Sequence, residues 1–268
     1  MMNTVSGKGS DGFLMTHRPW PPPAGPWVMR MCWHHLLFAH WRLDSHGAAQ
    51  IRSLLPAGLE LDLFGGRCYV GAVPFLMENV TPRFVPPLPG LHAFPELNLR
   101  TYVTAGGKPG VWFFSLDAGQ KLAVRLARRF FHLPYFDARF EVDVTGGVSY
   151  RAVRTHRGSA PAAFEAVYRS VGEVYRPEAG SLDSWLTGRY CLYSADSAGT
   201  VFRGEIDHAP WPLQPAEAEI RVNTLGDWLG IRMRGEPETL HFARSLDVHA
   251  WMIEPAATPH ADSPYPAA

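Results

Sequence analysis

Lysine is scarce in this chain of 268 residues. Of its 25 basic residues, only Lys8, Lys108 and Lys121 are lysines, and the others are arginines. Lysine is the side chain that attacks carbonyl groups to form Schiff bases, and it does so as a neutral amine whose pKa the surroundings have lowered. Chemistry of that kind has few residues to use here.

Cysteine is sparse as well. Cys32, Cys68 and Cys191 are far apart in the chain, odd in number and without a C-x-x-C pair. This pattern argues against a disulfide framework and against a zinc site, and it fits a reducing compartment. Walker, dinucleotide-binding, HExxH and GxSxG motifs are absent too, so we expect neither a metal nor an organic cofactor.

The chain also lacks net charge, because 25 acidic residues balance the 25 basic ones. No overall field draws it toward nucleic acid or an anionic membrane, and its arginines form no basic run. No apolar stretch approaches the roughly 20 residues that cross a bilayer. Residues 1–13 hold no hydrophobic stretch typical of a secretory signal. We therefore expect a cytoplasmic protein with neither nucleic-acid nor membrane partners.

Both ends of the sequence are rich in small residues and proline. Residues 1–27 end in RPWPPPAGP, and residues 255–268 read PAATPHADSPYPAA. Segments of this composition bury too little apolar surface to offset the entropy lost on ordering them. We expect two flexible tails around a single folded domain at residues 28–254.

Most of the folded region has the pattern of β-strands, with few helices between them. Ala105-Gly106-Gly107-Lys108 is suited to a hairpin turn. Many strands and few helices indicate an α+β domain built on a mostly antiparallel sheet. Aromatic, β-branched or alternating apolar residues predict strands at 29–41, 67–75, 97–104, 111–116, 136–144, 148–153, 162–168, 189–193, 200–206 and 240–253.

Two segments have helical patterns instead. A short helix is expected at residues 47–55, where Pro56 stops it. The clearer helix spans residues 121–131, because its apolar side chains recur at every fourth position while arginines occupy the other side. Its apolar positions are Leu122, Leu126 and Phe130.

One predicted strand carries a row of polar side chains. Alternate residues of a strand share a face, so Glu96, Asn98, Arg100 and Tyr102 line one side of the strand at 95–103. The pattern alone leaves two interpretations open. The row is the wet side of a half-buried strand, or it lines a cavity in which Glu96 moves a proton and Arg100 fixes a carbonyl or carboxylate group.

The turn after the second helix offers further candidates. Pro134 forces an extended backbone before it and ends the helix by Leu133. His132 and Tyr135 then emerge at a corner. They serve either as a capping group and a buried aromatic, or as parts of the same site.

Other histidines are weaker candidates. Strand alternation places His35 on the opposite face from His34 and His40, and six residues of extended strand separate the latter two by roughly 20 Å. We interpret all three as structural. The loop DHAPWPL holds His208 and Trp211 either as a lid near the cavity mouth or as a brace on the core.

Seven blocks stand out in order along the folded region: HHLLFAHW, YVGAVPFLMENVTPR, LPGLHAFPELNLRTYV, GVWFFSLDA, RRFFHLPYFDA, RYCLY and DHAPWPLQPAE. Together they resemble the YqjF family of uncharacterised bacterial proteins, which is placed in the acetoacetate-decarboxylase-like superfamily. The resemblance implies a closed, cone-like β-barrel with a few flanking helices around a central cavity. It also implies that the polar row points inward.

The resemblance further implies a change at Tyr135. Decarboxylases of the superfamily form a Schiff base through a lysine just after a proline, in a turn similar to Leu133-Pro134-Tyr135, and a neighbouring charge lowers the pKa of that lysine. This chain has tyrosine at that position, which argues against a Schiff-base decarboxylase. Glu96 is similar to the superfamily's acid and stands without its lysine partner.

Three functions stay open. The first is an enzyme, a lyase or another catalyst without a Schiff base, acting on a small anionic or carbonyl-containing molecule. The second is a binding protein that uses the same pocket without catalysis. The third is a structural or interaction protein whose barrel is filled by its own aromatic side chains. A homo-oligomer is compatible with each. For the enzyme, the candidate catalytic residues are Glu96, Tyr135 and His132, and the candidate substrate contacts are Arg100, Asn98, Tyr102, His208 and Trp211.

Overall fold

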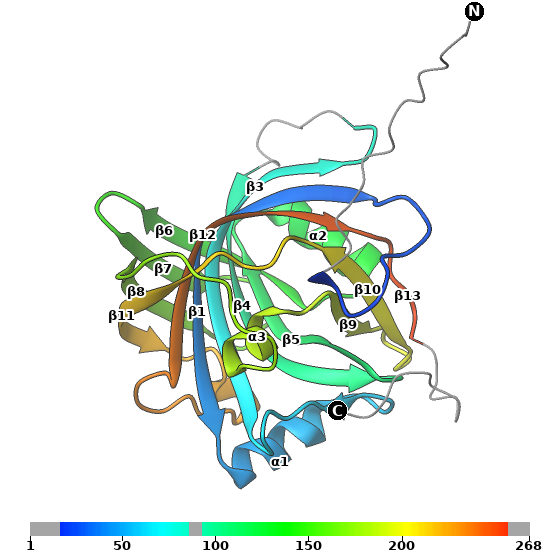
Figure 1. Cartoon of the computed structure of the whole chain (residues 1–268), viewed down its shortest axis with the longest axis horizontal. Coiled ribbons are helices and arrows are strands. Elements are labelled where there is room, and N and C mark those ends of the chain that lie inside the picture. Colours follow the sequence, from blue (N-terminus) through cyan, green and yellow to red (C-terminus); the bar gives the residue numbers. More distant parts are fainter. Residues whose placement is uncertain (1–16, 86–92, 257–268) are drawn as a thin grey trace, which may run out of the picture.

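The computed structural model of this chain describes residues 17–85 and 93–256 (Figure 1). Within these ranges strands dominate, as the sequence predicted. The strands are β1 (Met29–Leu43), β2 (Glu60–Leu61), β3 (Cys68–Pro82), β4 (Ala93–Ala105), β5 (Lys108–Ala118), β6 (Tyr135–Asp143), β7 (Val148–Arg154), β8 (Ala163–Ser170), β9 (Cys191–Ala195), β10 (Val201–Asp207), β11 (Leu213–Asn223), β12 (Thr239–Ala250) and β13 (Glu254–Pro255).

The α-helices are short, and a side chain caps the N-terminus of each. In α1 (Ser45–Leu54), the carboxylate of Asp44 accepts a hydrogen bond from the backbone N–H of Gly47. In α2 (Lys121–Phe131), the side chain of Gln120 accepts from the N–H of Leu122. The remaining helical segments are α3 (Leu182–Thr187) and the 3₁₀ turn η2 (Asp227–Leu229).

The strands close on themselves in two circuits that share one wall. The first circuit joins β5, β6, β7, β8, β11, β12, β1, β3 and β4, and it is a closed barrel of nine strands. The second joins β5, β9, β10, β12, β1, β3 and β4, because β10 pairs with β12 and β9 pairs with β5. Most neighbours are antiparallel, whereas β5 runs parallel to both β6 and β9. The closed, mostly antiparallel barrel confirms the predicted fold class.

The shared wall has an interior on each side. Leu97 and Leu99 of β4 pack into the apolar core of the nine-strand barrel. Phe94, on the other face of β4, belongs to a second apolar cluster, which lies inside the second circuit. A strand in this wall therefore buries both faces. The polar face of β4 is buried like the apolar one and does not face bulk solvent.

Backbone irregularities adjust which side chains face each interior. The hairpin between β4 and β5 turns at Gly106 and Gly107, both with positive φ, as the predicted hairpin requires. In β1, His35 has φ 53 and the pairing with β3 shifts between His34 and Ala39. This bulge changes the alternation in the middle of the strand.

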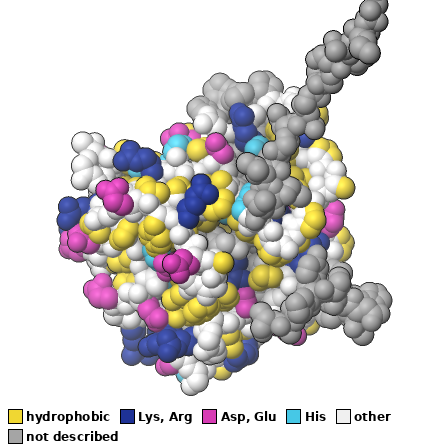
Figure 2. Space-filling view, viewed as in Figure 1, with side chains coloured by type: hydrophobic (Ala, Val, Ile, Leu, Met, Phe, Trp, Pro, Cys, Tyr) yellow, Lys and Arg dark blue, Asp and Glu magenta, His cyan; other side chains and the backbone are white. Residues whose placement is uncertain are grey.

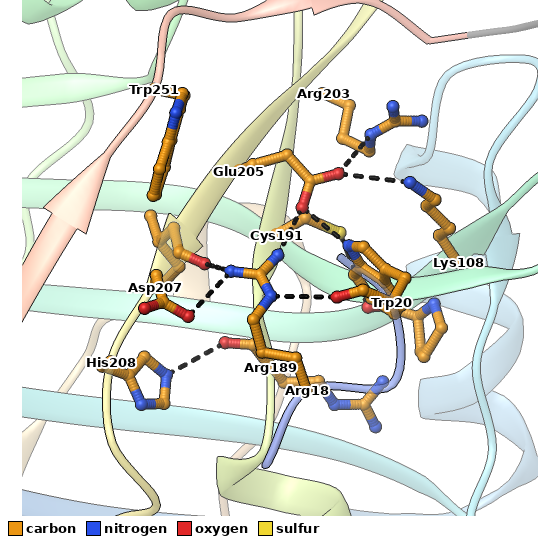
Figure 3. Close-up of polar contacts among 12 residues, drawn as sticks. Arg18, Trp20, Lys108, Arg189, Cys191, Arg203, Glu205, Asp207, His208 and Trp251 are labelled. Atoms are coloured by element: carbon orange, nitrogen blue, oxygen red, sulfur yellow. Dashed lines mark hydrogen bonds and ion pairs between the residues drawn. The ribbon is translucent and has the colours of Figure 1, made fainter. Parts of the chain in front are cut away.

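The predicted N-terminal tail differs from the structure at its end. Arg18 and Trp20 are buried, although both lie in the segment 1–27 that was expected to be flexible. The Arg18 guanidinium donates to Glu205 at 2.9 Å, to Asp207 at 3.0 Å and to the Ile206 carbonyl at 2.6 Å (Figure 3). Composition suggested a loose segment, but one arginine with two carboxylate partners fixes it on β10. Residues 1–16 and 257–268 of the two expected tails lie outside the described residues.

Acidic and basic side chains are interspersed on the face drawn in Figure 2, without a patch of one sign. This distribution agrees with the balanced net charge. Among the helices in the described ranges, none is both long and apolar enough to cross a bilayer.

Candidate active site

A cavity of about 270 Å³ lies inside the second circuit, between the shared wall and α2. Three neighbouring strands of the wall supply one side, and α2, the start of β6 and the strands β9 and β10 supply the other. The described part of the barrel is thus hollow on this side. The lining of β1, β3 and β4 consists of Met29, Met31, Trp33, Leu36, Val73, Phe75, Met77, Val80, Pro82, Phe94, Glu96, Asn98 and Arg100.

Three of the four residues in the polar row of β4 point into this cavity. Glu96, Asn98 and Arg100 all line it, and their neighbours Leu97 and Leu99 face the barrel core. The register places Phe75 of β3 opposite Glu96. The row follows the second interpretation of the sequence pattern, in which it lines a cavity, because β4 is the central strand of a two-sided wall.

Glu96 is a buried carboxyl group with one side-chain hydrogen-bond partner among the described residues. It is 1% exposed, and its Oε2 accepts a hydrogen bond of 3.0 Å from the hydroxyl of Tyr135. Burial raises the pKa of Glu96 to about 8, and the negative charge of Asp117 adds to the rise, whereas the Tyr135 hydrogen bond acts in the opposite direction. The group is therefore a protonated acid at neutral pH and titrates just above it.

Tyr135 is the first residue of β6 and follows the turn that ends α2. The backbone of the turn is fixed, because Arg128 donates to the Tyr135 carbonyl at 2.6 Å and the N–H of Leu116 donates to the Pro134 carbonyl at 3.0 Å. Burial, followed by the charge of Glu96, raises the pKa of Tyr135 well above its ordinary value. Tyr135 is thus a hydrogen-bond donor that stays neutral beside Glu96.

Arg100 lines the cavity four residues along β4 from Glu96, without an acidic partner among the described residues. Its Nη2 donates to the Tyr102 hydroxyl at 3.2 Å and to the Leu186 carbonyl at 3.4 Å. The guanidinium lies 5.2 Å from the centre of the Phe38 ring. Its Nε is buried and makes no hydrogen bond in the described structure. An arginine held this way keeps donors free for an anion.

Tyr102 does not line the cavity, but its hydroxyl accepts the hydrogen bond that orients Arg100. The Tyr102 hydroxyl also lies 2.6 Å from Nε2 of His40, which sequence reasoning assigned to a structural role. Burial and the charge of Arg100 lower the pKa of His40 well below its ordinary value, so the imidazole is neutral. The sequence signal for this packing is Gly71, where an added Cβ would lie 2.8 Å from the His40 ring.

The structure brings Trp211 to the cavity and leaves His132 and His208 away from it. Trp211 lines the cavity with its ring edge-on to Phe38, at 4.8 Å between centroids. His132 ends α2 in the left-handed conformation, and its ring packs on Phe202 at 4.9 Å. His208 is buried, with Nδ1 2.7 Å from the Ala209 carbonyl.

Sequence reasoning did not find Trp33. It lines the cavity from β1, and its indole N–H is buried with no hydrogen-bond partner in the described structure. Oδ1 of Asn98 is likewise buried and unpaired among the described residues. Two side chains that line the cavity therefore carry a buried donor and a buried acceptor without partners among the described residues. The signal for Trp33 was its place two residues after Met31 and four after Met29, on one strand face.

No lysine lines the cavity among the described residues. Lys108 pairs with Glu205 at 3.4 Å, beside the ring of Trp20 (Figure 3). Lys121 starts α2 and is exposed. In the ranges 17–85 and 93–256, no three His, Cys, Asp or Glu side chains come together as a metal site would require.

The sequence matches a known family over residues 30–247, by the model DUF2071, whose description is "Uncharacterized conserved protein". It is also 46% identical over 232 residues to the uncharacterized protein YqjF of Bacillus subtilis (strain 168), covering 86% of this chain and 93% of that protein. The chain belongs to this family. The resemblance of the seven sequence blocks is thereby confirmed.

Several solved structures share this fold, and two of the three described here are named as acetoacetate decarboxylase or a decarboxylase-like enzyme. An acetoacetate decarboxylase-like enzyme from Sphingomonas wittichii RW1 has a TM-score of 0.58 at 15% identity, over 90% of this chain and 99% of that one. The enduracididine biosynthesis enzyme MppR complexed with pyruvate has a TM-score of 0.58 at 14% identity, and the match covers 90% of this chain and 93% of MppR. Acetoacetate decarboxylase from Legionella pneumophila has a TM-score of 0.55 at 12% identity, and the match covers 94% of this chain and 98% of that one. At these identities the likeness establishes the fold of this family member.

Proposed function

We propose that this chain catalyses an acid-assisted reaction on a small carboxylate that also carries a carbonyl group, without forming a Schiff base. One observation carries the proposal. A carboxyl group that is protonated near neutral pH, Glu96, shares a cavity with an arginine that has no acidic partner among the described residues, Arg100. These are the two groups that such a substrate needs, a proton donor and an anion holder.

Arg100 would bind the carboxylate of the substrate. Hydrogen bonds between a guanidinium and a carboxylate are charge-assisted and strong when water is excluded. Phe38 and the Tyr102 hydroxyl hold the guanidinium in one orientation. The Arg100 side chain therefore loses little conformational entropy when the substrate binds. The neutral state of His40 leaves the positive charge of Arg100 without a second cation beside it.

Glu96 would donate its proton to the carbonyl oxygen as negative charge develops there. A general acid is most effective when its pKa lies near the working pH, and a value of about 8 meets that condition. Once the proton has left, the Tyr135 hydroxyl donates to the resulting carboxylate at 3.0 Å and stabilises it. The reaction class is enol formation by loss of carbon dioxide: the bond to the carboxylate breaks, its electron pair forms the enol double bond, and the Glu96 proton ends on the enol oxygen.

The fold supports the same substrate class. MppR, which has the same fold, is known in complex with pyruvate, a small keto acid. Lys108 is engaged by Glu205 and does not itself line the cavity, so no described lysine supplies the amine that a Schiff base needs near Glu96. Acid catalysis by Glu96 replaces it in this proposal.

The test is a screen of 2-oxo and 3-oxo acids in D₂O, followed by proton NMR. Loss of the acid, with deuterium taken up at the carbon that carried the carboxylate, is expected for the wild type and is abolished in Glu96→Gln. Glu217→Gln, at an exposed glutamate, is the matched control. Normal turnover by Glu96→Gln contradicts the proposal. Binding that depends on Arg100, without exchange or turnover in the wild type, would identify a binding protein instead.

A further inference from the structure

The cavity extends well beyond the two polar groups that the proposed function uses. Along β4 the lining residues are Phe94, Glu96, Asn98 and Arg100, in that order. Two residues of strand span about 7 Å and four span about 13 Å. A ligand with its carboxylate on Arg100 and its carbonyl near Glu96 therefore occupies that part of the cavity and leaves the part around Phe94 empty.

The outer part of the cavity is apolar. The register places Met77 opposite Phe94, and Met29 and Met31 of β1 line the same region. Glu205 is the only other carboxylate of the described lining. Its two oxygens are already held by Arg18, Trp20, Arg203 and Lys108 (Figure 3). A polar ligand would find few partners here.

The helix α2 continues this apolar surface to the outside. Leu126 and Phe130 line the cavity, yet they are 46% and 51% exposed. Apolar side chains that are half in the cavity and half in water gain from contact with an apolar ligand that passes between them and the opposite wall. Methionines on that wall adapt to tails of different shape.

We infer that the ligand is a carboxylate with an extended apolar tail, its head at Arg100 and its tail between Met77, Phe94 and α2. The position of the head group in this inference rests on the proposed function, whereas the position of the tail rests only on the apolar lining of the cavity. A medium-chain acyl acid has this chemistry, whereas a short keto acid such as pyruvate would leave the outer cavity empty.

The test is calorimetric titration with straight-chain fatty acids from butanoate to decanoate, which bind without reacting. Each buried methylene is expected to tighten binding about fourfold until the tail reaches the surface. Leu126→Glu should weaken octanoate at least tenfold and leave butanoate unchanged. Leu122→Glu is the matched control, because Leu122 is 48% exposed on the same helix but does not line the cavity. This variant should leave the affinity for both acids unchanged.

The outcomes separate the tail from the head. Equal affinity for butanoate and octanoate, no binding of any acid, or equal effects of Leu126→Glu and Leu122→Glu would each overturn the inference. If octanol binds as tightly as octanoate and Arg100→Gln changes neither, the tail site stands while the anion site of the proposed function fails.

Discussion

The Tyr135 hydroxyl lies 3.0 Å from Oε2 of Glu96, and both side chains are buried in the wall of one cavity. This contact defines the chemistry available to the protein. Burial keeps the Glu96 carboxyl protonated, and the tyrosine provides a hydrogen bond that strengthens when the proton leaves. A tyrosine at this point can assist an acid, but it cannot form a Schiff base with a substrate.

Arg100→Gln is expected to weaken carboxylate binding about tenfold to a hundredfold, because hydrogen bonds to charged groups contribute about 1.5–3 kcal/mol. Tyr102→Phe removes only the hydrogen bond of 3.2 Å that orients Arg100 and should have a smaller effect. The measurement is calorimetric titration with a bound acid and with its methyl ester. An equal loss for the ester would contradict a role in recognising charge.

Borohydride reduction in the presence of pyruvate should leave no adduct on the protein. Lys108 is held in an ion pair with Glu205, and Lys121 is exposed at the start of α2, so neither presents its amine inside the cavity. Mass spectrometry of peptides from the reduced protein is the measurement. Stoichiometric reduction onto Lys108 or Lys121 would restore the Schiff-base mechanism that the structure argues against.

Arg18→Ala is expected to destabilise the folded protein by about 3–5 kcal/mol, because it removes the arginine partner of the buried Asp207 carboxylate and one of the two arginines on Glu205. Urea unfolding measures this change. Arg169→Ala is the control, since its pair with Glu217 is exposed on both sides and should contribute close to nothing. Equal midpoints for the two variants would show that the segment around Arg18 adds nothing to the folded domain.

Glu96 should make stability depend on pH in a defined direction. Its pKa is about 8 in the folded protein against an ordinary value of 4.5, so the folded state holds the proton more tightly than the unfolded state. The stabilisation is fully present below pH 4.5 and is lost as the pH rises toward 8. At about 1.4 kcal/mol per pH unit, the loss is at most about 5 kcal/mol.

Glu96→Gln removes this dependence. The variant should therefore gain stability relative to the wild type between pH 5 and pH 8, measured by urea unfolding at both values. A constant difference between the two proteins would mean that the carboxyl is ionised in the folded state throughout.

The polar row was predicted from the strong alternation in β4, and the closed barrel was predicted from the family resemblance. It did not predict β11, whose segment reads LQPAEAEIRVN. Alanine and glutamate are poor strand formers on their own. Here the segment forms a strand because β8 pairs along most of its length, which is a tertiary effect that local composition does not reveal.

Other parts of the site depended on contacts between distant segments. His40 reaches Arg100 through Tyr102, and the close approach requires Gly71 on the neighbouring strand. The role of Arg18 requires β10, far along the chain, to present two carboxylates. His132 was a reasonable candidate from its place beside the turn, but the left-handed end of α2 turns its ring toward Phe202.

The protonation state of Glu96 can be measured directly by carbon-13 NMR titration of the side-chain carboxyl, with Glu96→Gln to assign the signal. A neutral acid in the cavity requires a midpoint near pH 8 in the ligand-free protein. A midpoint near 4.5, as in an exposed glutamate, would contradict the assignment of Glu96 as a general acid.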